Sequence, residues 1–194
     1  MFKKLLFVSL FLIPALSLNA QSWKLIWADE FDGTTVDQSK WVFEQGNNNG
    51  WGNQEREYYT NRSQNAYIDN GSLVIKAIKE IYNGYDYTSA RMKTQGKFSV
   101  KYGKIEARMK LPYGQGIWPA FWMLGTNISS VGWPACGEID IMELIGGSGT
   151  RDRTAYGTAH WDDGGHKQKG SSYSLTSGKF ADDYHTFALE WDDS

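Results

Sequence analysis

Stretches in which apolar and charged residues alternate constrain the fold of this chain more than any other feature. At residues 104–111 the odd positions are apolar and the even positions are charged, a pattern that is typical of a β-strand with one buried face. Three further runs, 71–78, 117–124 and 187–191, also predict strands. The run 117–124 is mostly apolar, which favours an inner strand covered on both faces. Because no stretch has convincing helical periodicity, the sequence predicts an all-β protein folded as a β-sandwich.

The composition agrees with this fold class. The chain has 9 Trp and 21 Gly among 194 residues, which suits strands joined by tight turns. Exposed indole rings also suit a sugar-binding cleft, because they pack against the apolar faces of pyranose rings. The net charge is −2 without a basic stripe, which argues against nucleic acid as a partner. Cys136 is the only cysteine, so no internal disulfide can form, and we expect it to be a small buried apolar residue.

The first 20 residues have the pattern of a signal peptide. Lys3 and Lys4 precede an apolar run over residues 5–18, and Ala20 is a small residue at the expected cleavage point. The run is shorter than the roughly 20 apolar residues of a membrane-spanning helix. We therefore expect a secreted protein, periplasmic or extracellular, with no membrane span in the mature chain.

Residues 21–194 have the size of one domain, which we expect to be a monomer. The chain ends directly after the predicted strand 187–191, with no element to cover the edge of that strand. Because an uncovered sheet edge is unfavourable, we expect this domain to lack the C-terminal strands of a longer protein.

Residues 137–144, with the sequence GEIDIMEL, carry the expected chemistry. Alternate residues of a strand share a face, so Glu138 and Asp140 point the same way and the two isoleucines point into the core. Glu143 lies five residues after Glu138, and a regular strand would turn it to the opposite face. One extra residue between Asp140 and Glu143 would form a β-bulge and bring all three acids to one face.

Three neighbouring carboxylates cannot all ionise cheaply, so their pKa values separate. A retaining glycosidase needs an ionised carboxylate and a protonated carboxylic acid about 5–5.5 Å apart. The spacing therefore predicts Glu138 as nucleophile and Glu143 as general acid and then base, with Asp140 holding Glu138 through a shared proton. The alternatives are a solvated acidic face, which leaves the apolar neighbours unexplained, and a metal site, for which no histidine lies nearby in the sequence.

These residues resemble the catalytic strand of glycoside hydrolase family 16, in particular its laminarinase-like β-1,3-glucanases. The hexapeptide at 138–143 has the bulged form E-x-D-x-x-E of that group, whereas the lichenase branch uses the shorter E-x-D-x-E. Supporting segments match over nearly all of the expected mature chain, at residues 27–31, 50–55, 58–60, 87–91, 116–124 and 157–161.

The resemblance implies a jelly-roll β-sandwich of two curved antiparallel sheets, with a polysaccharide cleft on the concave sheet. It implies retaining endo-hydrolysis of β-1,3-glucan or β-1,3-1,4-glucan by double displacement, with no cofactor for catalysis and a β-glucan as partner. An agar or porphyran hydrolase is an alternative, although a sulfated substrate favours a basic cleft. A non-catalytic β-glucan-binding protein is a further alternative, but such relatives lack the catalytic glutamates. A structural envelope protein would leave the three acids unexplained.

The resemblance also implies substrate-contacting residues near the acids. Trp118 and Trp122 match tryptophans that stack on sugars beside the cleaved bond, and burial in the core is their alternative role. Arg91 matches a substrate-contacting arginine, and a surface salt bridge is its alternative role. Trp51 and Asn53 match a loop that contacts sugars on the non-reducing side, where a turn-forming Asn is equally consistent.

One tryptophan and three histidines complete the set of candidates. Trp133 lies in a loop before the acidic strand, where we expect another stacking platform. His160 matches the family's cleft histidine near the nucleophile, and a buried structural histidine is the alternative. His166 and His185 match no family position, and we expect them to be structural or surface residues.

Many members of the family carry a calcium ion on the convex side, away from catalysis. Glu30 and the carbonyl oxygen of Gly71 match its N-terminal ligands. The matching aspartate belongs to the C-terminal segment of the family, which this chain lacks. The resemblance therefore implies a structural calcium site of which this sequence supplies only a part.

Overall fold

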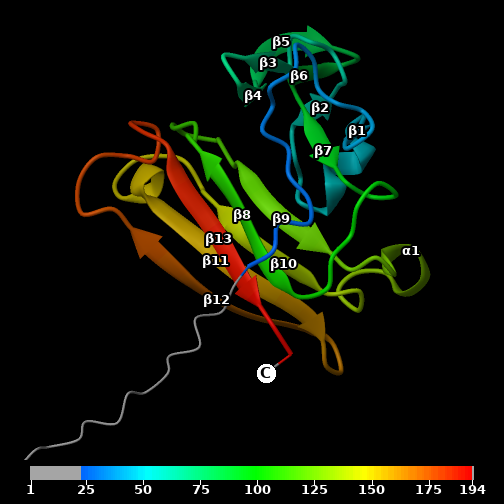
Figure 1. Cartoon of the computed structure of the whole chain (residues 1–194). Helices are drawn as coiled ribbons and strands as arrows, with labels where there is room; N and C mark the ends of the chain where they lie inside the picture. The colour runs from blue at the N-terminus through cyan, green and yellow to red at the C-terminus, as the bar shows by residue number, and fades with distance from the viewer. Residues whose placement is uncertain (1–22, 194) are drawn as a thin grey trace, which may run out of the picture.

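The computed structural model describes residues 23–193, and β-strands dominate it (Figure 1). The predicted signal peptide, residues 1–20, lies outside the described residues. The long strands are β8 (Gly103–Met109), β9 (Ala120–Leu124), β10 (Glu138–Glu143), β11 (Thr154–Asp162), β12 (His166–Ser174) and β13 (His185–Trp191). The short strands are β1 (Val42–Glu44), β2 (Glu57–Tyr59), β3 (Ala66–Asp69), β4 (Ser72–Ile75), β5 (Ile78–Tyr82), β6 (Tyr85–Ser89) and β7 (Arg91–Lys93). The helical segments are α1 (Ile128–Val131) and the 3-10 helices η1 (Asn48–Gly52) and η2 (Arg151–Arg153), so the all-β prediction is confirmed.

Two layers of strands enclose the main core. One is an antiparallel sheet in the order β12-β11-β10-β9, and the other is the antiparallel pair β13–β8, which lies across it (Figure 1). Met109 of β8 and Phe187 of β13 pack against the buried cluster between the layers. Fully burying such side chains stabilises the fold by about 1.5–3 kcal/mol each. The buried cluster consists of Leu111, Met142, Leu144, Ala155 and Phe180.

Three small sheets lie beside these layers (Figure 1). They are the pair β1–β7, the pair β3–β4 and the three-stranded sheet β2-β6-β5. β6 is the returning arm of the β5–β6 hairpin, and this reversal leaves it parallel to β2. The expectation of two antiparallel sheets therefore describes the main layers, whereas hydrogen bonding divides all the described strands into five sheets, one of which contains a parallel pair.

The predicted strands are confirmed in position but differ in extent. β8 and β13 occupy the runs 104–111 and 187–191, and they pair with each other. The run 71–78 is broken, because β4 ends at Ile75 and β5 begins at Ile78. The run 117–124 is a strand only from Ala120, and β9 is the edge of its sheet with no fully buried residue. The expectation of a strand covered on both faces was therefore wrong, because Phe121 packs against the core whereas Trp122 faces the site described below.

The hairpin β3–β4 has the turn that its sequence predicts. Asn70 and Gly71 have φ values of 48° and 70° and lie between the paired residues Asp69 and Ser72. A two-residue loop with both residues left-handed is a type I′ turn, which favours Asn-Gly. Cys136 differs from its prediction, because it is half-buried rather than buried.

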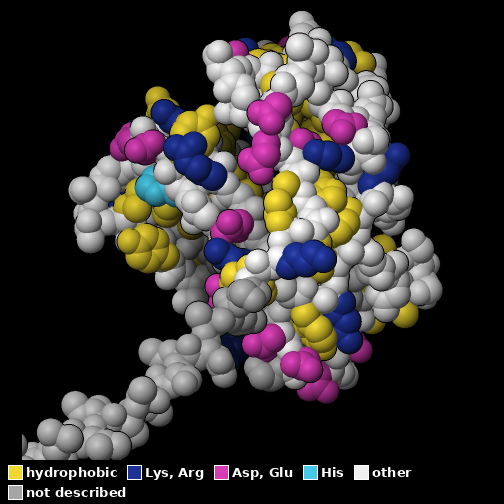
Figure 2. Space-filling model, in the orientation of Figure 1, with side chains coloured by type: hydrophobic (Ala, Val, Ile, Leu, Met, Phe, Trp, Pro, Cys, Tyr) yellow, Lys and Arg dark blue, Asp and Glu magenta, His cyan; other side chains and the backbone are white. Residues whose placement is uncertain are grey.

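The surface carries charges of both signs. Figure 2 shows acidic and basic side chains interspersed on one face of the molecule, so no extended patch of one sign dominates that face. Among residues 23–193, no helix combines the length and the apolar character that crossing a membrane requires.

Gly125 follows β9 at a point where two backbone segments lie close together, so a side chain there should lower the stability of the fold. A Cβ atom there would lie 1.9 Å from the carbonyl oxygen of Cys136. We predict that Gly125→Ala lowers the free energy of unfolding by about 1–3 kcal/mol, the range for overpacking, as measured by thermal or urea denaturation. Gly33→Ala is the matched control, because its Cβ would approach only Thr35 at an ordinary 3.4 Å. Equal stability of the two variants would contradict this account of the close approach.

Candidate active site

Strand β10 carries the three acids and contains the predicted irregularity. Its register against β11 is regular from Glu138 to Asp140 and shifts before Glu143. Its register against β9 shifts in the same interval. The extra residue is the β-bulge that the sequence predicted. Because Met142 is buried in the core, the next side chain, Glu143, turns toward the face of the other two acids.

The bulge also determines which apolar residues of β10 fill the core. Met142 and Leu144 are 1% and 0% exposed, whereas Ile139 and Ile141 are only half-buried. The alternation of the sequence predicts core positions for the two isoleucines. The structure gives the deepest positions to Met142 and Leu144, because the extra residue advances the alternation by one.

Burial is the main cause of a raised pKa in all three acids. It raises the pKa of Glu138, against an opposing effect of the charge on His160. Burial and then the charge of Glu138 raise the pKa of Asp140 to about 6. Burial and then the charge of Asp140 raise the pKa of Glu143. Groups that titrate in one another's fields are typical of catalytic carboxylates, which need different protonation states at one pH.

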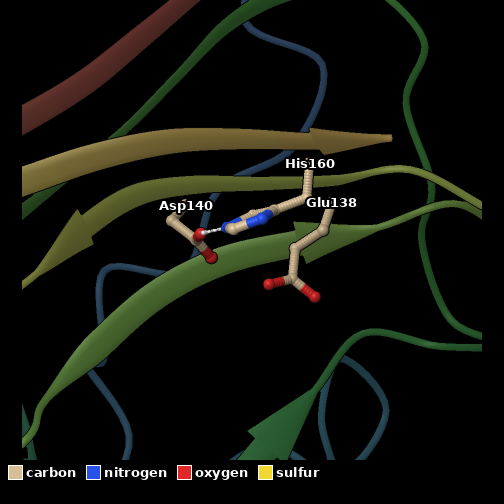
Figure 3. A group of neighbouring side chains, drawn as sticks. All are labelled: Glu138, Asp140 and His160. Atoms are coloured by element: carbon tan, nitrogen blue, oxygen red, sulfur yellow. Dashed lines mark hydrogen bonds and ion pairs between the residues drawn. The ribbon is translucent and has the colours of Figure 1, made fainter. Parts of the chain in front are cut away.

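His160 lies against the acids, as Figure 3 shows. It is the cross-strand partner of Glu138 on β11, and its Nε2 lies 3.1 Å from Oδ2 of Asp140. Asp140 is itself only 5% exposed. The contact orients the Asp140 carboxylate and lowers its pKa against the effect of burial.

His166 is a residue that the sequence analysis did not place at the site. Its Nε2 lies 2.8 Å from Nδ1 of His160, and its ring centroid lies 4.6 Å from that of Trp133. The β11–β12 hairpin pairs Asp162 with His166, which brings the two histidines together. The Gly-Gly turn between the strands is the sequence signal that could have indicated this contact. His185 is structural as expected, with its ring centroid 4.9 Å from that of Phe180.

Two of the predicted tryptophans contact the acids directly. Nε1 of Trp118 donates a hydrogen bond of 2.9 Å to Oε1 of Glu143, and this bond lowers the pKa of that carboxyl. The Trp133 side chain lies beside Glu138 and likewise lowers the pKa of that carboxyl. Because Trp118 is 47% and Trp133 is 49% exposed, both rings are available to a ligand, and neither belongs to the core.

Arg91 is fixed between two aromatic rings beside the acids. Its guanidinium carbon lies 4.7 Å from the ring centroid of Trp51 and 4.8 Å from that of Trp122. Nε of Arg91 lies 2.6 Å from Oε2 of Glu44. The charge of Arg91 lowers the pKa of Glu138, so this group acts on the acids as well as on its neighbours.

The loop that precedes β2 joins the same cluster. Oε1 of Glu55 lies 3.6 Å from Nη1 of Arg91, and Nδ2 of Asn53 donates a 3.4 Å hydrogen bond to that same oxygen. Trp51 has a left-handed backbone with φ of 52°, an unusual conformation for a bulky residue, and it directs the indole at Arg91. Glu44 and Glu55 were not identified from the sequence.

The expected calcium ligands lie away from this cluster. Glu30 and Gly71 are exposed, and Gly71 occupies the turn between β3 and β4. Within residues 23–193, no group of three acidic or histidine side chains gathers at Glu30. The described residues therefore do not supply a carboxylate cage there, and calcium binding at Glu30 and Gly71 stays a prediction.

Comparison with known proteins places this arrangement in a family. The model for the glycosyl hydrolases family 16 matches residues 52–194, which is most of the chain. The chain belongs to glycosyl hydrolase family 16. The laminarinase catalytic domain of Thermotoga maritima MSB8 superposes on this family 16 chain with a TM-score of 0.80 and 52% identity, over 89% of this chain and 72% of that one. The jelly-roll fold that the resemblance implied is thereby confirmed.

Two relatives each align with 89% of this family 16 chain. The beta-glucanase of Rhodothermus marinus is 43% identical over 180 residues, which are 89% of this chain and 61% of that protein. The clotting factor G alpha subunit of Tachypleus tridentatus is 46% identical over 175 residues, which are 89% of this chain and 24% of that protein. The chain therefore spans between a quarter and three fifths of the length of these two relatives.

The raised pKa of Asp140 predicts how the stability of this family 16 chain depends on pH. The ordinary value for an aspartate is 3.8, and the pKa in the folded protein is about 6. Between these values the folded state binds more protons than the unfolded state. The contribution of Asp140 to the free energy of unfolding therefore decreases as the pH rises from about 4 to about 6.

Asp140→Asn removes this titration and should change the pH profile. Relative to wild type, the variant should gain stability as the pH rises through that window, by up to about 1.4 kcal/mol for each unit of pKa shift. Urea denaturation at pH 4, 5, 6 and 7 measures the difference. Asp86→Asn, at an exposed position on β6, controls for loss of a carboxylate. A difference between wild type and Asp140→Asn that stays constant with pH would contradict the assignment.

Proposed function

We propose that the protein hydrolyses internal bonds of β-1,3-glucan with retention of configuration, and that it also accepts mixed β-1,3-1,4-glucan. One observation carries the proposal. The bulge in β10 turns Glu138 and Glu143 to the same face, where Glu143 accepts a hydrogen bond from the half-exposed Trp118 and the half-exposed Trp133 lies beside Glu138. The names of the laminarinase domain and the beta-glucanase reported above support the substrate class.

The first step divides the work between the two glutamates. The ionised Glu138 carboxylate attacks the anomeric carbon, and Glu143 transfers its proton to the departing glycosidic oxygen, so the bond to the leaving sugar breaks as the bond to Glu138 forms. Burial raises the pKa of Glu143, which favours the protonated form that this step needs. Burial raises the pKa of Glu138, whereas the charge of His160, the neighbouring Trp133 side chain and the charge of Arg91 oppose this effect and favour the ionised form.

The second step reverses these roles. Glu143, now a carboxylate, takes a proton from water while the water oxygen attacks the anomeric carbon and displaces Glu138. Asp140 is a positioning residue in this scheme. Its raised pKa lets it hold a proton beside Glu138, which limits repulsion between the two carboxylates when both approach the sugar.

The exposed rings supply the subsites for the polymer. Trp118 and Trp133 each expose about half of their surface beside an acid, and sugar rings stack on such faces. Binding of sugar rings to both tryptophans would hold a polymer across the acids, which suits internal cleavage. Arg91 sits between Trp51 and Trp122, where it can donate hydrogen bonds to sugar hydroxyls on the non-reducing side.

Glu138→Gln should abolish hydrolysis while leaving glucan binding intact. The amide keeps the shape of the side chain but cannot attack carbon. We expect laminarin turnover to fall at least about 10⁴-fold, a loss typical of a missing nucleophile, with binding measured by affinity electrophoresis. Glu80→Gln, on β5 in a separate sheet, is the matched control. Turnover of Glu138→Gln near that of the control would remove Glu138 from this role.

Azide should restore activity to Glu143→Ala but not to Glu138→Gln. An activated aryl β-glucoside substrate needs little acid catalysis, so the first step still proceeds and azide then replaces the activated water. We expect a several-fold increase in rate and formation of a β-glycosyl azide. The absence of both effects would argue against Glu143 as the acid and base.

Product analysis on laminarin, barley glucan, lichenan and agarose tests the substrate class. Oligosaccharides from laminarin, with or without products from the mixed-linkage glucans, are the expected result. Release of products from agarose alone would show that the substrate is a galactan and not a β-glucan. Binding of laminarin without turnover would identify a glucan-binding protein.

We propose also that residues 1–20 direct export of the chain and are removed near Ala20. The charged start and the apolar run support this proposal. Expression with and without residues 1–20 tests it, and the shortened mass of the exported protein should correspond to a start at Gln21. Retention of the complete chain inside the cell would contradict it.

A further inference from the structure

The three side chains in Figure 3 also have the arrangement of metal ligands. Glu138, Asp140 and His160 each offer one ligand atom, and these atoms lie within 4.8 Å of one another. Among residues 23–193, they form the one group of this kind. Zn²⁺ binds carboxylate oxygen and imidazole nitrogen at about 2.0–2.2 Å, so small side-chain rotations suffice to bring the three atoms around one ion.

The electrostatics of the group favour a cation. Two carboxylates with the same charge lie side by side, with ligand atoms within 4.8 Å of one another, and Asp140 is buried. A divalent ion between them removes this repulsion and compensates for their loss of water. No histidine lies near the acids in the sequence, which argues against a metal site. This argument was wrong, because β11 brings His160 opposite Glu138.

His166 lies where it can orient a metal-bound His160 through a hydrogen bond. Nε2 of His160 faces Asp140 at 3.1 Å, so this nitrogen is the one that would bind an ion. Its other nitrogen, Nδ1, lies 2.8 Å from Nε2 of His166. Metal-bound histidines are held in this way by a hydrogen bond from the second ring nitrogen, and loss of such a partner costs about 10–100-fold in affinity.

We propose that Glu138, Asp140 and His160 form a Zn²⁺ site, with His166 as outer partner, and that bound Zn²⁺ inhibits the protein. An ion on the Glu138 carboxylate withdraws the electron pair that would attack the sugar. It also replaces the contact between His160 and Asp140. The inhibition rests on the proposed function, whereas binding of the ion does not.

Isothermal titration of the untagged protein with ZnCl₂ at pH 7 tests the site directly. We expect one Zn²⁺ per chain, with affinity at least about tenfold lower in His160→Gln and in His166→Gln. His185→Gln is the matched control, because His185 packs against Phe180 outside the group, and it should bind like wild type. MgCl₂ should bind at least about tenfold more weakly than ZnCl₂, because imidazole suits zinc and not magnesium.

Equal zinc affinity in His160→Gln and His185→Gln would overturn the site, and so would equal affinity for zinc and magnesium. Circular dichroism checks that each variant folds, and Asp140→Asn replaces His160→Gln in the comparison if the latter does not. In the activity assay, ZnCl₂ should reduce laminarin hydrolysis and EDTA should restore it. Tight zinc binding with unchanged turnover would overturn the inhibition. A protein without any turnover would overturn the proposed function, while calorimetry would still decide the zinc site.

Discussion

The β-bulge in β10 is the constraint on which the site depends. A strand alternates its side chains between two faces, and without one extra residue Glu143 would point away from Glu138. The register shifts against both neighbouring strands, so the bulge is held from two sides. It also places Met142 and Leu144 in the core. The same irregularity therefore anchors the sheet to the opposite layer and assembles the acids.

The neighbours of β10 then give the acids different environments. β9 contributes Trp122, which supports Arg91, and β11 contributes His160, which contacts Asp140. Trp118 and Trp133 come from the segments before and after β9, and each lies beside one glutamate. Burial raises the pKa of all three acids, and a different set of neighbours opposes this effect at each of them. The same crowding of negative charge and imidazole explains why the group suits a zinc ion.

Much of this could be predicted from local sequence patterns, and the rest could not for identifiable reasons. Alternation predicted β8 and β13, and the spacing of the acids predicted the bulge. The prediction of core positions for Ile139 and Ile141 was wrong, because the bulge advances the alternation by one residue and buries Met142 and Leu144 instead. The parallel pairing of β2 and β6 depends on which distant segments pair, and the contact of His166 with His160 depends on how the β11–β12 hairpin folds back. The periodicity of apolar residues does not show which segments pair or pack together.

The central claim is that both glutamates act from one face at the short separation of a retaining enzyme. Proton NMR during the first minutes of laminarioligosaccharide hydrolysis tests this claim directly, because it identifies the anomer that forms before mutarotation. The account predicts that the β-anomer appears first and the α-anomer grows only later. Initial release of the α-anomer would mean that water attacks directly between more widely separated carboxylates, and it would contradict the account.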